Sequence, residues 1–245
     1  MRARDKGIYR ETFILSEVLS MNVPQCTKCV GGYCAKSDWE ESQLPEFCPM
    51  KHKGEIIEEA MSKYEDSDAR ELYVNSTIIE QEAYMLVRGR RISVRPRVLE
   101  IIKFLEKMGW NRVGIAYCGG LRNEARRIVE IFESAGLEVY SVRCKCGSVD
   151  KTVFKVPKEY KISNLFGEPD RFEAGCNPIV QAEVLNSESL DLHIIVGLCI
   201  GHDIQFTEHS EALTTTLIVK DRVTGHNPMV SLYSAYHHPR YWDEK

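Results

Sequence analysis

From Arg112 onward, the sequence alternates between short, continuous apolar runs and longer amphipathic segments. The continuous apolar run at residues 113–117 predicts a strand buried on both faces, and further strands are predicted at residues 138–142, 193–198 and 215–219. Strands joined through helices lie parallel in one sheet with right-handed crossovers. The sequence therefore predicts an α/β fold with a parallel, Rossmann-like sheet and flanking helices.

Less regular and helical segments surround these strands. Residues 148–174 contain several Pro and Gly residues and are expected to form a long loop or insertion, and Asn227-Pro228 opens a last short helix. Three amphipathic helical patterns precede the sheet, at residues 53–66, 69–88 and 96–109. The predicted organisation is an N-terminal extension, a Cys-rich knuckle, a helical segment packing on the sheet and the α/β domain, at residues 1–20, 21–53, 54–110 and 111–245.

Charge and apolar content narrow the class of protein. A formal net charge of -4 gives no general reason to expect binding to nucleic acid or to a membrane. No apolar stretch approaches the length of a membrane span, and the N-terminus lacks the pattern of a secretory signal. We therefore expect a cytoplasmic protein. The odd number of cysteines, 9, then argues against a disulfide framework and for reduced thiols that hold metal or do chemistry.

Four of the cysteines cluster near the N-terminus. Cys26 and Cys29 have C-x2-C spacing, Gly31-Gly32 lets the backbone bend toward Cys34, and Cys48 follows before a proline. Four thiolates suit a tetrahedral zinc ion, and they equally suit a 4Fe-4S or 2Fe-2S cluster, since a Cys-Pro pair also ends bacterial ferredoxin runs. The knuckle is therefore predicted to bind zinc or iron-sulfur, with four free buried thiols as the alternative.

The other five cysteines mostly follow the predicted strands. Cys118 comes after the first strand, Cys144 and Cys146 after the second, and Cys199 after the third, while Cys176 precedes a helix that runs to residue 186. Parallel strands bring their carboxyl ends to one edge of the sheet, where open α/β sheets bind ligands. We therefore expect a crevice lined by several of these thiols, although a single buried Cys often only fills space.

Polar residues accompany the thiols at the same predicted edge. His202 and Asp203 are candidate proton donors, His226 a candidate base, and Lys220, Arg222 and Asn227 candidate holders of an anionic group. An arginine cluster lies before the third helical pattern, and Arg95 and Arg97 are its candidates for anion binding because they lead into a helix N-terminus. A solvated charged face is the alternative for that cluster.

Three interpretations of the crevice are open. In the first, several of the five thiolates ligate a second iron-sulfur cluster. In the second, Cys118 is a nucleophile whose pKa is lowered by the following Gly-Gly and helix N-terminus, with His202 or His226 as base. In the third, Cys144 and Cys146 form a redox pair, although their spacing has one residue fewer than thioredoxin-like motifs. We rank the metal site first and the nucleophile second.

Several of these segments together resemble a known family. They are Cys26-x2-Cys29-x4-Cys34, Gly114-Ile-Ala-Tyr-Cys118-Gly-Gly-Leu-Arg-Asn-Glu-Ala125, Gly175-Cys-Asn-Pro178, Gly197-Leu-Cys-Ile-Gly-His-Asp203 and Val219-Lys-Asp-Arg-Val-Thr-Gly-His-Asn-Pro228. Across residues 22–235 the chain is similar to the domain-of-unknown-function family numbered eighteen forty-seven. That family is usually labelled metal-binding and is found mostly in anaerobic bacteria and archaea. The resemblance implies metal binding, and an anaerobic setting favours iron-sulfur.

These observations lead to one leading functional hypothesis and two alternatives. The leading hypothesis is a cytosolic metal-binding protein that does redox or sulfur chemistry on a small molecule at the crevice, with an electron-transfer partner as a further option. The first alternative is a non-catalytic zinc module for metal sensing, delivery or partner docking. The second is a transferase or hydrolase with a Cys nucleophile.

Overall fold

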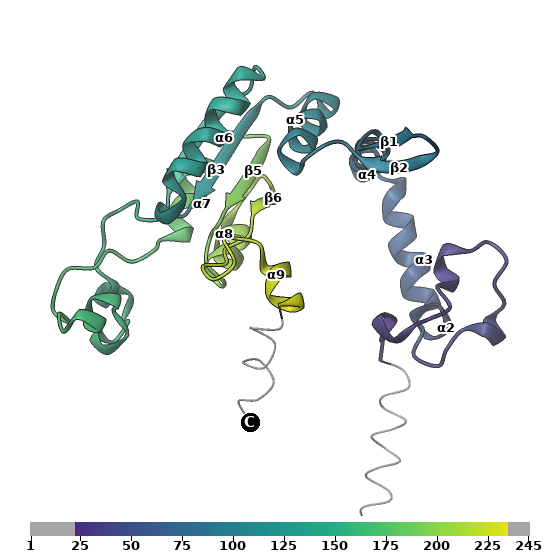
Figure 1. Cartoon of the computed structure of the whole chain (residues 1–245), viewed down its shortest axis with the longest axis horizontal. Helices are drawn as coiled ribbons and strands as arrows, with labels where there is room; N and C mark the ends of the chain where they lie inside the picture. The colour runs from purple at the N-terminus through teal and green to yellow at the C-terminus, as the bar shows by residue number, and fades with distance from the viewer. Residues whose placement is uncertain (1–22, 235–245) are drawn as a thin grey trace, which may run out of the picture. The chain divides into compact units, whose positions relative to one another are not determined.

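The computed structural model describes residues 23–234, which form parts of two compact units, Met1–Val74 and Asn75–Lys245 (Figure 1). The N-terminal extension predicted at residues 1–20 lies outside the described residues, as does the end of the predicted last helix. In the part of the chain that the structure describes, no helix has both the length and the apolar character needed to cross a membrane.

The first unit consists of short helices. Pro49 occupies the first turn of its four-residue helix, where its fixed backbone angle and missing N–H are tolerated. The elements are the 3-10 helices η1 (Cys26–Lys28), η2 (Tyr33–Ala35), η3 (Glu41–Gln43) and η4 (Lys63–Glu65), the helices α2 (Pro49–His52) and α3 (Gly54–Ser62), and the beginning of α4 (Ser67–Glu82). The helix predicted at residues 53–66 is thus confirmed as α3 with η4.

A β-hairpin replaces the end of one predicted helix. The pattern at residues 69–88 predicted a single helix, but α4 ends at Glu82 and is followed by β1 (Tyr84–Val87) and β2 (Arg90–Ser93), which pair antiparallel. Arg88 and Gly89 form the two-residue connection, both with left-handed backbone, at φ 51° and 75°. Two such residues give the primed turn that matches the twist of a hairpin, so the glycine closes a hairpin here and does not end a helix.

The second unit contains the predicted parallel sheet. Its strands are β3 (Arg112–Tyr117), β4 (Glu138–Arg143), β5 (Leu192–Val196) and β6 (Leu213–Ile218), in the order β4-β3-β5-β6. All three neighbouring pairs are parallel, which confirms the α/β class. The side chains of β5 are buried along its whole length, as expected for a strand covered on both faces.

Helices cover both faces of the sheet. On one face, α5 (Arg97–Met108) and α6 (Arg122–Ser134) contribute Leu105 and Phe132, both fully buried, to a cluster with alternate residues of β3 and β5. On the other face, α7 (Pro178–Asn186) and α8 (His202–His209) contribute Leu185 and Phe206 to a second cluster that includes Ala116. The sequence analysis had not identified α8. The chain continues after β6 to α9 (Pro228–Tyr233).

The predicted insertion lies between β4 and α7. It contains the 3-10 helices η6 (Lys151–Phe154), η7 (Lys158–Tyr160) and η8 (Ile162–Phe166). Asp150 is its centre: its carboxylate accepts hydrogen bonds from the backbone N–H groups of Thr152 and Glu173 and from the buried Lys161, at 2.9, 2.7 and 3.2 Å. These bonds lower the pKa of Asp150 and tie the two ends of the insertion together.

Candidate functional site

A cavity of about 700 Å³ opens at the carboxyl ends of the strands. From β3 the chain passes first to β4 on one side and then crosses to β5 on the other, so the point between β3 and β5 is where the strand order reverses. Open α/β sheets bind ligands outside such a switch point, because the loops from neighbouring strands diverge there and leave a crevice. The location matches the edge that the sequence predicted.

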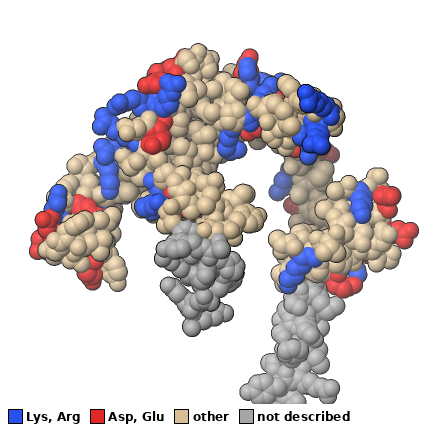
Figure 2. Space-filling view, viewed as in Figure 1, with Lys and Arg blue, Asp and Glu red and all other residues tan. Residues whose placement is uncertain are grey.

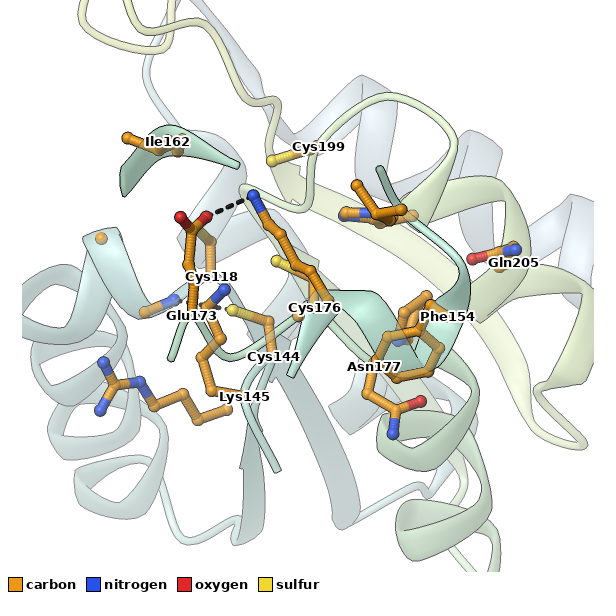
Figure 3. Close-up of a pocket in the computed structure, with 18 of the residues that line it drawn as sticks. Cys118, Cys144, Lys145, Phe154, Ile162, Glu173, Cys176, Asn177, Cys199 and Gln205 are labelled. Carbon is orange, nitrogen blue, oxygen red and sulfur yellow. Dashed lines mark hydrogen bonds and ion pairs between the residues drawn. The ribbon is translucent and has the colours of Figure 1, made fainter. Parts of the chain in front are cut away.

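Four thiols line this cavity, and they come from four different segments (Figure 3). Cys118 follows β3, Cys144 follows β4 and Cys199 follows β5, while Cys176 lies just before α7. Tyr117 and Arg143 are register partners at the end of β3 and β4, so Cys118 and Cys144 are the next pair along the same two strands. The backbone N–H of Asn177 donates to the carbonyl of Cys144 at 2.8 Å, which places Cys176 next to Cys144.

Cys118 has the environment of a reactive thiolate. A hydrogen bond from the Cys144 thiol, with bonds from the backbone N–H of Gly120 and from the Lys220 ammonium, lowers the pKa of Cys118 to about 4, although partial burial opposes the shift. Lys220 approaches from the end of β6 beside Gly197. These interactions favour the thiolate form of Cys118.

Cys176 is paired with a different cation. Its pKa is lowered to about 4 by a hydrogen bond from Cys144 and by one from His202 at the start of α8, and the bond to Cys176 raises the pKa of His202 in return. Since Cys144 has one thiol proton, it donates to only one of its two neighbours at a time. Each thiolate nevertheless keeps its own cation. The pKa of Cys144 is raised because this residue is buried and lies between two negative charges, so Cys144 stays protonated.

The cavity wall is basic and partly apolar. Arg222 donates from Nη2 to the Sγ of Cys199 at 2.9 Å, and Lys145 donates to the carbonyl of Ala174. The Arg143 guanidinium lies so close to Gly119 that a side-chain carbon at that glycine would be 2.7 Å from Nε. Lys151 forms an ion pair with Glu173, drawn as the dashed line in Figure 3. Two arginines and two lysines therefore line the cavity together with a single carboxylate.

The insertion supplies the apolar part of the wall. Phe154, Val156 and Ile162 line the cavity, and the ring of Phe154 packs against Gly175, next to Cys176. Figure 2 shows much of the insertion as uncharged surface, with acidic and basic side chains at its margins. The cavity thus combines a basic, thiol-rich floor with an apolar wall, a surface suited to a small organic anion.

The other predicted site residues have different surroundings. Cys146 lies in the turn after β4, with its N–H donating to Arg143, and His226 closes a turn by accepting from the N–H of Asp221 at 3.0 Å. Arg95 forms an ion pair with Glu82 at 2.8 Å. Among the described residues, the cavity lining does not include these side chains, nor those of Asp203, Lys220 and Asn227. Lys220 contacts Cys118 all the same.

Sequence analysis missed three residues of the basic wall. Arg143 ends β4 and Lys145 follows it, so the rule that strand ends meet at one edge would have found both. Lys151 belongs to the insertion, where neither periodicity nor spacing indicates which side chains turn toward the sheet. Its place is a consequence of the ion pair with Glu173 and of the bonds around Asp150.

The N-terminal thiols lie on short turns of the first unit. The N–H of Cys29 donates to the carbonyl of Cys26 at 3.0 Å, Gly32 has left-handed backbone before the turn that contains Cys34, and Cys48 caps α2. All nine cysteines are free thiols. Within residues 23–234, no group of three or more His, Cys, Asp or Glu side chains is spaced to hold a metal ion. The donor atoms and tight turns suit zinc or iron-sulfur, and metal binding here stays a prediction.

Comparison with known proteins identifies a family and a relative of this chain, and neither has a described activity. Residues 48–217 match a family described as a protein of unknown function, DUF1847. The chain is also 44% identical over 185 residues to the uncharacterised protein MJ0455 of Methanocaldococcus jannaschii, a match that covers 76% of this chain and 87% of the relative. The segment matched by the family contains the four cavity thiols and Cys48, whereas Cys26, Cys29 and Cys34 lie before it.

Proposed function

The chain belongs to the DUF1847 family of proteins of unknown function, and from its site we propose that the α/β domain performs redox or sulfur chemistry on a small anionic molecule, with Cys118 as the reacting thiol. The observation that carries this proposal is the convergence of four thiols on one cavity at the switch point of the sheet, two of them paired with separate cations. Thiolates beside cations in a partly exposed cavity are typical of reactive cysteines and not of structural ones.

Each neighbouring group has a role in this chemistry. The Cys118 thiolate attacks the substrate, and the N–H of Gly120 with the Lys220 ammonium keeps it ionised. Arg143 and Arg222 hold the anionic part of the substrate through charge-assisted hydrogen bonds. The hydrogen bond to Cys176 raises the pKa of His202, which favours its protonated form, and His202 supplies the proton that a leaving group takes up.

Charge-selective alkylation tests this proposal. Under limiting reagent, Cys118 is expected to be the first thiol modified, and its rate ratio for anionic iodoacetate over neutral iodoacetamide should exceed that of N-acetylcysteine by about tenfold, because the cations concentrate the anion. Peptide mapping by mass spectrometry identifies the modified residue and gives both rates. Arg143→Gln should lower the ratio.

The control for that variant is Lys103→Gln, which removes a positive charge from α5, where Lys103 pairs with Glu106 on the helix surface. It should leave the ratio unchanged. The proposal fails if Cys118 is not modified ahead of Cys199 and the N-terminal thiols, or if its charge ratio equals that of N-acetylcysteine.

A second candidate function is metal binding by Cys26, Cys29, Cys34 and Cys48. It is favoured by four free thiols held on adjacent tight turns of one short segment. Bound zinc would supply structural cross-linking of this unit, and an iron-sulfur cluster would supply electron relay. This candidate is compatible with thiol chemistry in the cavity, because the two cysteine sets lie in different units.

Metal analysis of protein purified without oxygen tests this second candidate. About one zinc ion, or about four iron atoms with acid-labile sulfide, is expected per chain, because four thiolates complete either site. Cys29→Ser should remove most of the metal, whereas the matched variant Cys146→Ser should retain it. Metal-free protein would contradict the candidate. Iron that is lost in Cys118→Ser would instead indicate a cluster held by the cavity thiols.

A further inference from the structure

Cys144 lies next to Cys118, directly after the neighbouring strands β4 and β3. The register pair Tyr117 and Arg143 precedes the two cysteines, and the N–H of Cys144 donates to the carbonyl of Tyr117 at 2.9 Å. Neighbouring strands are about 4.8 Å apart, within the range of about 4.4–6.8 Å that separates the Cα atoms of disulfide-bonded cysteines. A disulfide between these two residues therefore requires little movement of the backbone.

The two side chains also point the same way. Ala116 and Cys144 belong to the core cluster on the face covered by α7 and α8, and Cys118 packs against that same cluster. The N–H of Gly119 donates to the Sγ of Cys144 at 3.2 Å, which fixes this sulfur beside the residue that follows Cys118. Cys146, in contrast, is placed in the turn beyond this face.

We propose that Cys144 is the resolving thiol for Cys118, and that the substrate is a small anionic molecule containing a disulfide bond. This inference deepens the proposed function and depends on it for the role of Cys118. The buried Cys144 thiol lies between the thiolates of Cys118 and Cys176, so it can attack the first sulfur while the second takes up its proton.

The reaction proceeds in two exchanges. First, the Cys118 thiolate forms a bond to one sulfur of the substrate, the substrate S–S bond breaks, and the other half leaves as a thiolate. Second, Cys144 transfers its proton to the Cys176 thiolate and attacks the Sγ of Cys118, and the second half of the substrate leaves as a thiolate. The two cysteines lose two electrons, the substrate gains them, and the proton rests on Cys176.

Electrostatics sets the order of these exchanges. In the resting site the negative charges of Cys118 and Cys176 and the burial of Cys144 keep the pKa of Cys144 raised, so it is a poor nucleophile. Once Cys118 is part of a mixed disulfide its negative charge is gone, and one of the two repulsions on Cys144 disappears. Cys144 therefore becomes reactive only after the first exchange.

The probe for this inference is 5,5′-dithiobis(2-nitrobenzoate), an anionic aromatic disulfide whose two halves absorb when released. With reagent limiting and protein in its reduced form, the wild type should release about two coloured thiolates per molecule of reagent, because resolution frees the second half. Cys144→Ala and Cys144→Ser should each release about one and keep the other half on Cys118. Cys146→Ala should behave as wild type.

Mapping of the disulfide products distinguishes failure of the resolving role of Cys144 from failure of the proposed function. Peptides should contain a bond between Cys118 and Cys144 in the wild type, obtained with a protease that cuts after glutamate, since trypsin would leave Cys144 on a two-residue fragment. A stable adduct on Cys118 in the wild type, or a bond from Cys144 to Cys146 or Cys176, overturns the resolving role and leaves the proposed function standing. Absence of any product on Cys118 overturns both. Circular dichroism confirms that the Cys144 variants are folded.

Discussion

Alkylation of Cys118 by iodoacetamide is expected to proceed at nearly the same rate from about pH 8 down to about pH 5. The reason is that the thiolate reacts, and hydrogen bonds from Cys144, Gly120 and Lys220 hold the pKa of Cys118 at about 4. An ordinary thiol loses about tenfold in rate for each pH unit below its pKa. At about pH 5 the advantage of Cys118 should therefore reach roughly 30-fold, even after allowance for the lower nucleophilicity of a less basic thiolate. The measurement is the rate of modification, followed by peptide mapping.

The pH dependence of the alkylation rate also identifies the groups that lower the pKa of Cys118. Cys144→Ala removes the largest stabilising hydrogen bond and Lys220→Met removes the cation, so in both variants the pKa of Cys118 should rise and the rate at about pH 5 should fall by about tenfold. Lys103→Met, a lysine on the surface of α5, is the matched control and should keep the plateau. A wild-type rate that declines steadily between about pH 8 and pH 6 would show that Cys118 is an ordinary thiol.

The fold was predictable from the sequence where strands and helices alternate along the chain. The central strands β3 and β5 are short apolar runs that are buried along most of their length, and such strands lie parallel and are covered by helices, whereas the edge strands β4 and β6 are only partly buried. The hairpin after α4 was not predictable from periodicity, because its apolar residues also fit one face of a helix. The left-handed backbone of Arg88 and Gly89 favours a hairpin over a continued helix, because it suits a hairpin turn.

The site was predictable as a place more than as a set of residues. The rule that parallel strand ends meet correctly gathered Cys118, Cys144 and Cys199 at one cavity, because it depends only on topology. It did not distinguish Cys144 from Cys146, since the chain leaves β4 at Arg143 and turns, and the turn places Cys146 outside the cavity lining. Helix α8, which presents His202 to Cys176, lacks a strong apolar period and depends on Phe206 alone for its buried contact with the core.

Replacement of Gly197 by alanine is expected to lower the free energy of unfolding of the α/β unit by about 3 kcal/mol. Gly197 ends β5 with a left-handed φ of 64°, and a side-chain carbon there would be 2.0 Å from Cδ1 of Leu121, which is 3% exposed. Backbone strain accounts for roughly 1 kcal/mol of this cost, and the displacement of a buried leucine accounts for the rest. Chemical denaturation, followed by a signal from the sheet, gives the value.

Two further variants separate strain from collision. Gly167 also has a left-handed φ, 75°, but has open space around it, so Gly167→Ala should cost about 1 kcal/mol, the strain alone. Leu121→Ala removes the atom that collides, and adding Gly197→Ala to it should then cost little more than Gly167→Ala. Equal costs for the two single glycine variants would contradict the collision.

Because the N–H of Leu121 donates to the carbonyl of Cys118 at 2.8 Å, the collision should also move Cys118 and slow its alkylation, whereas Gly167→Ala should leave that rate unchanged.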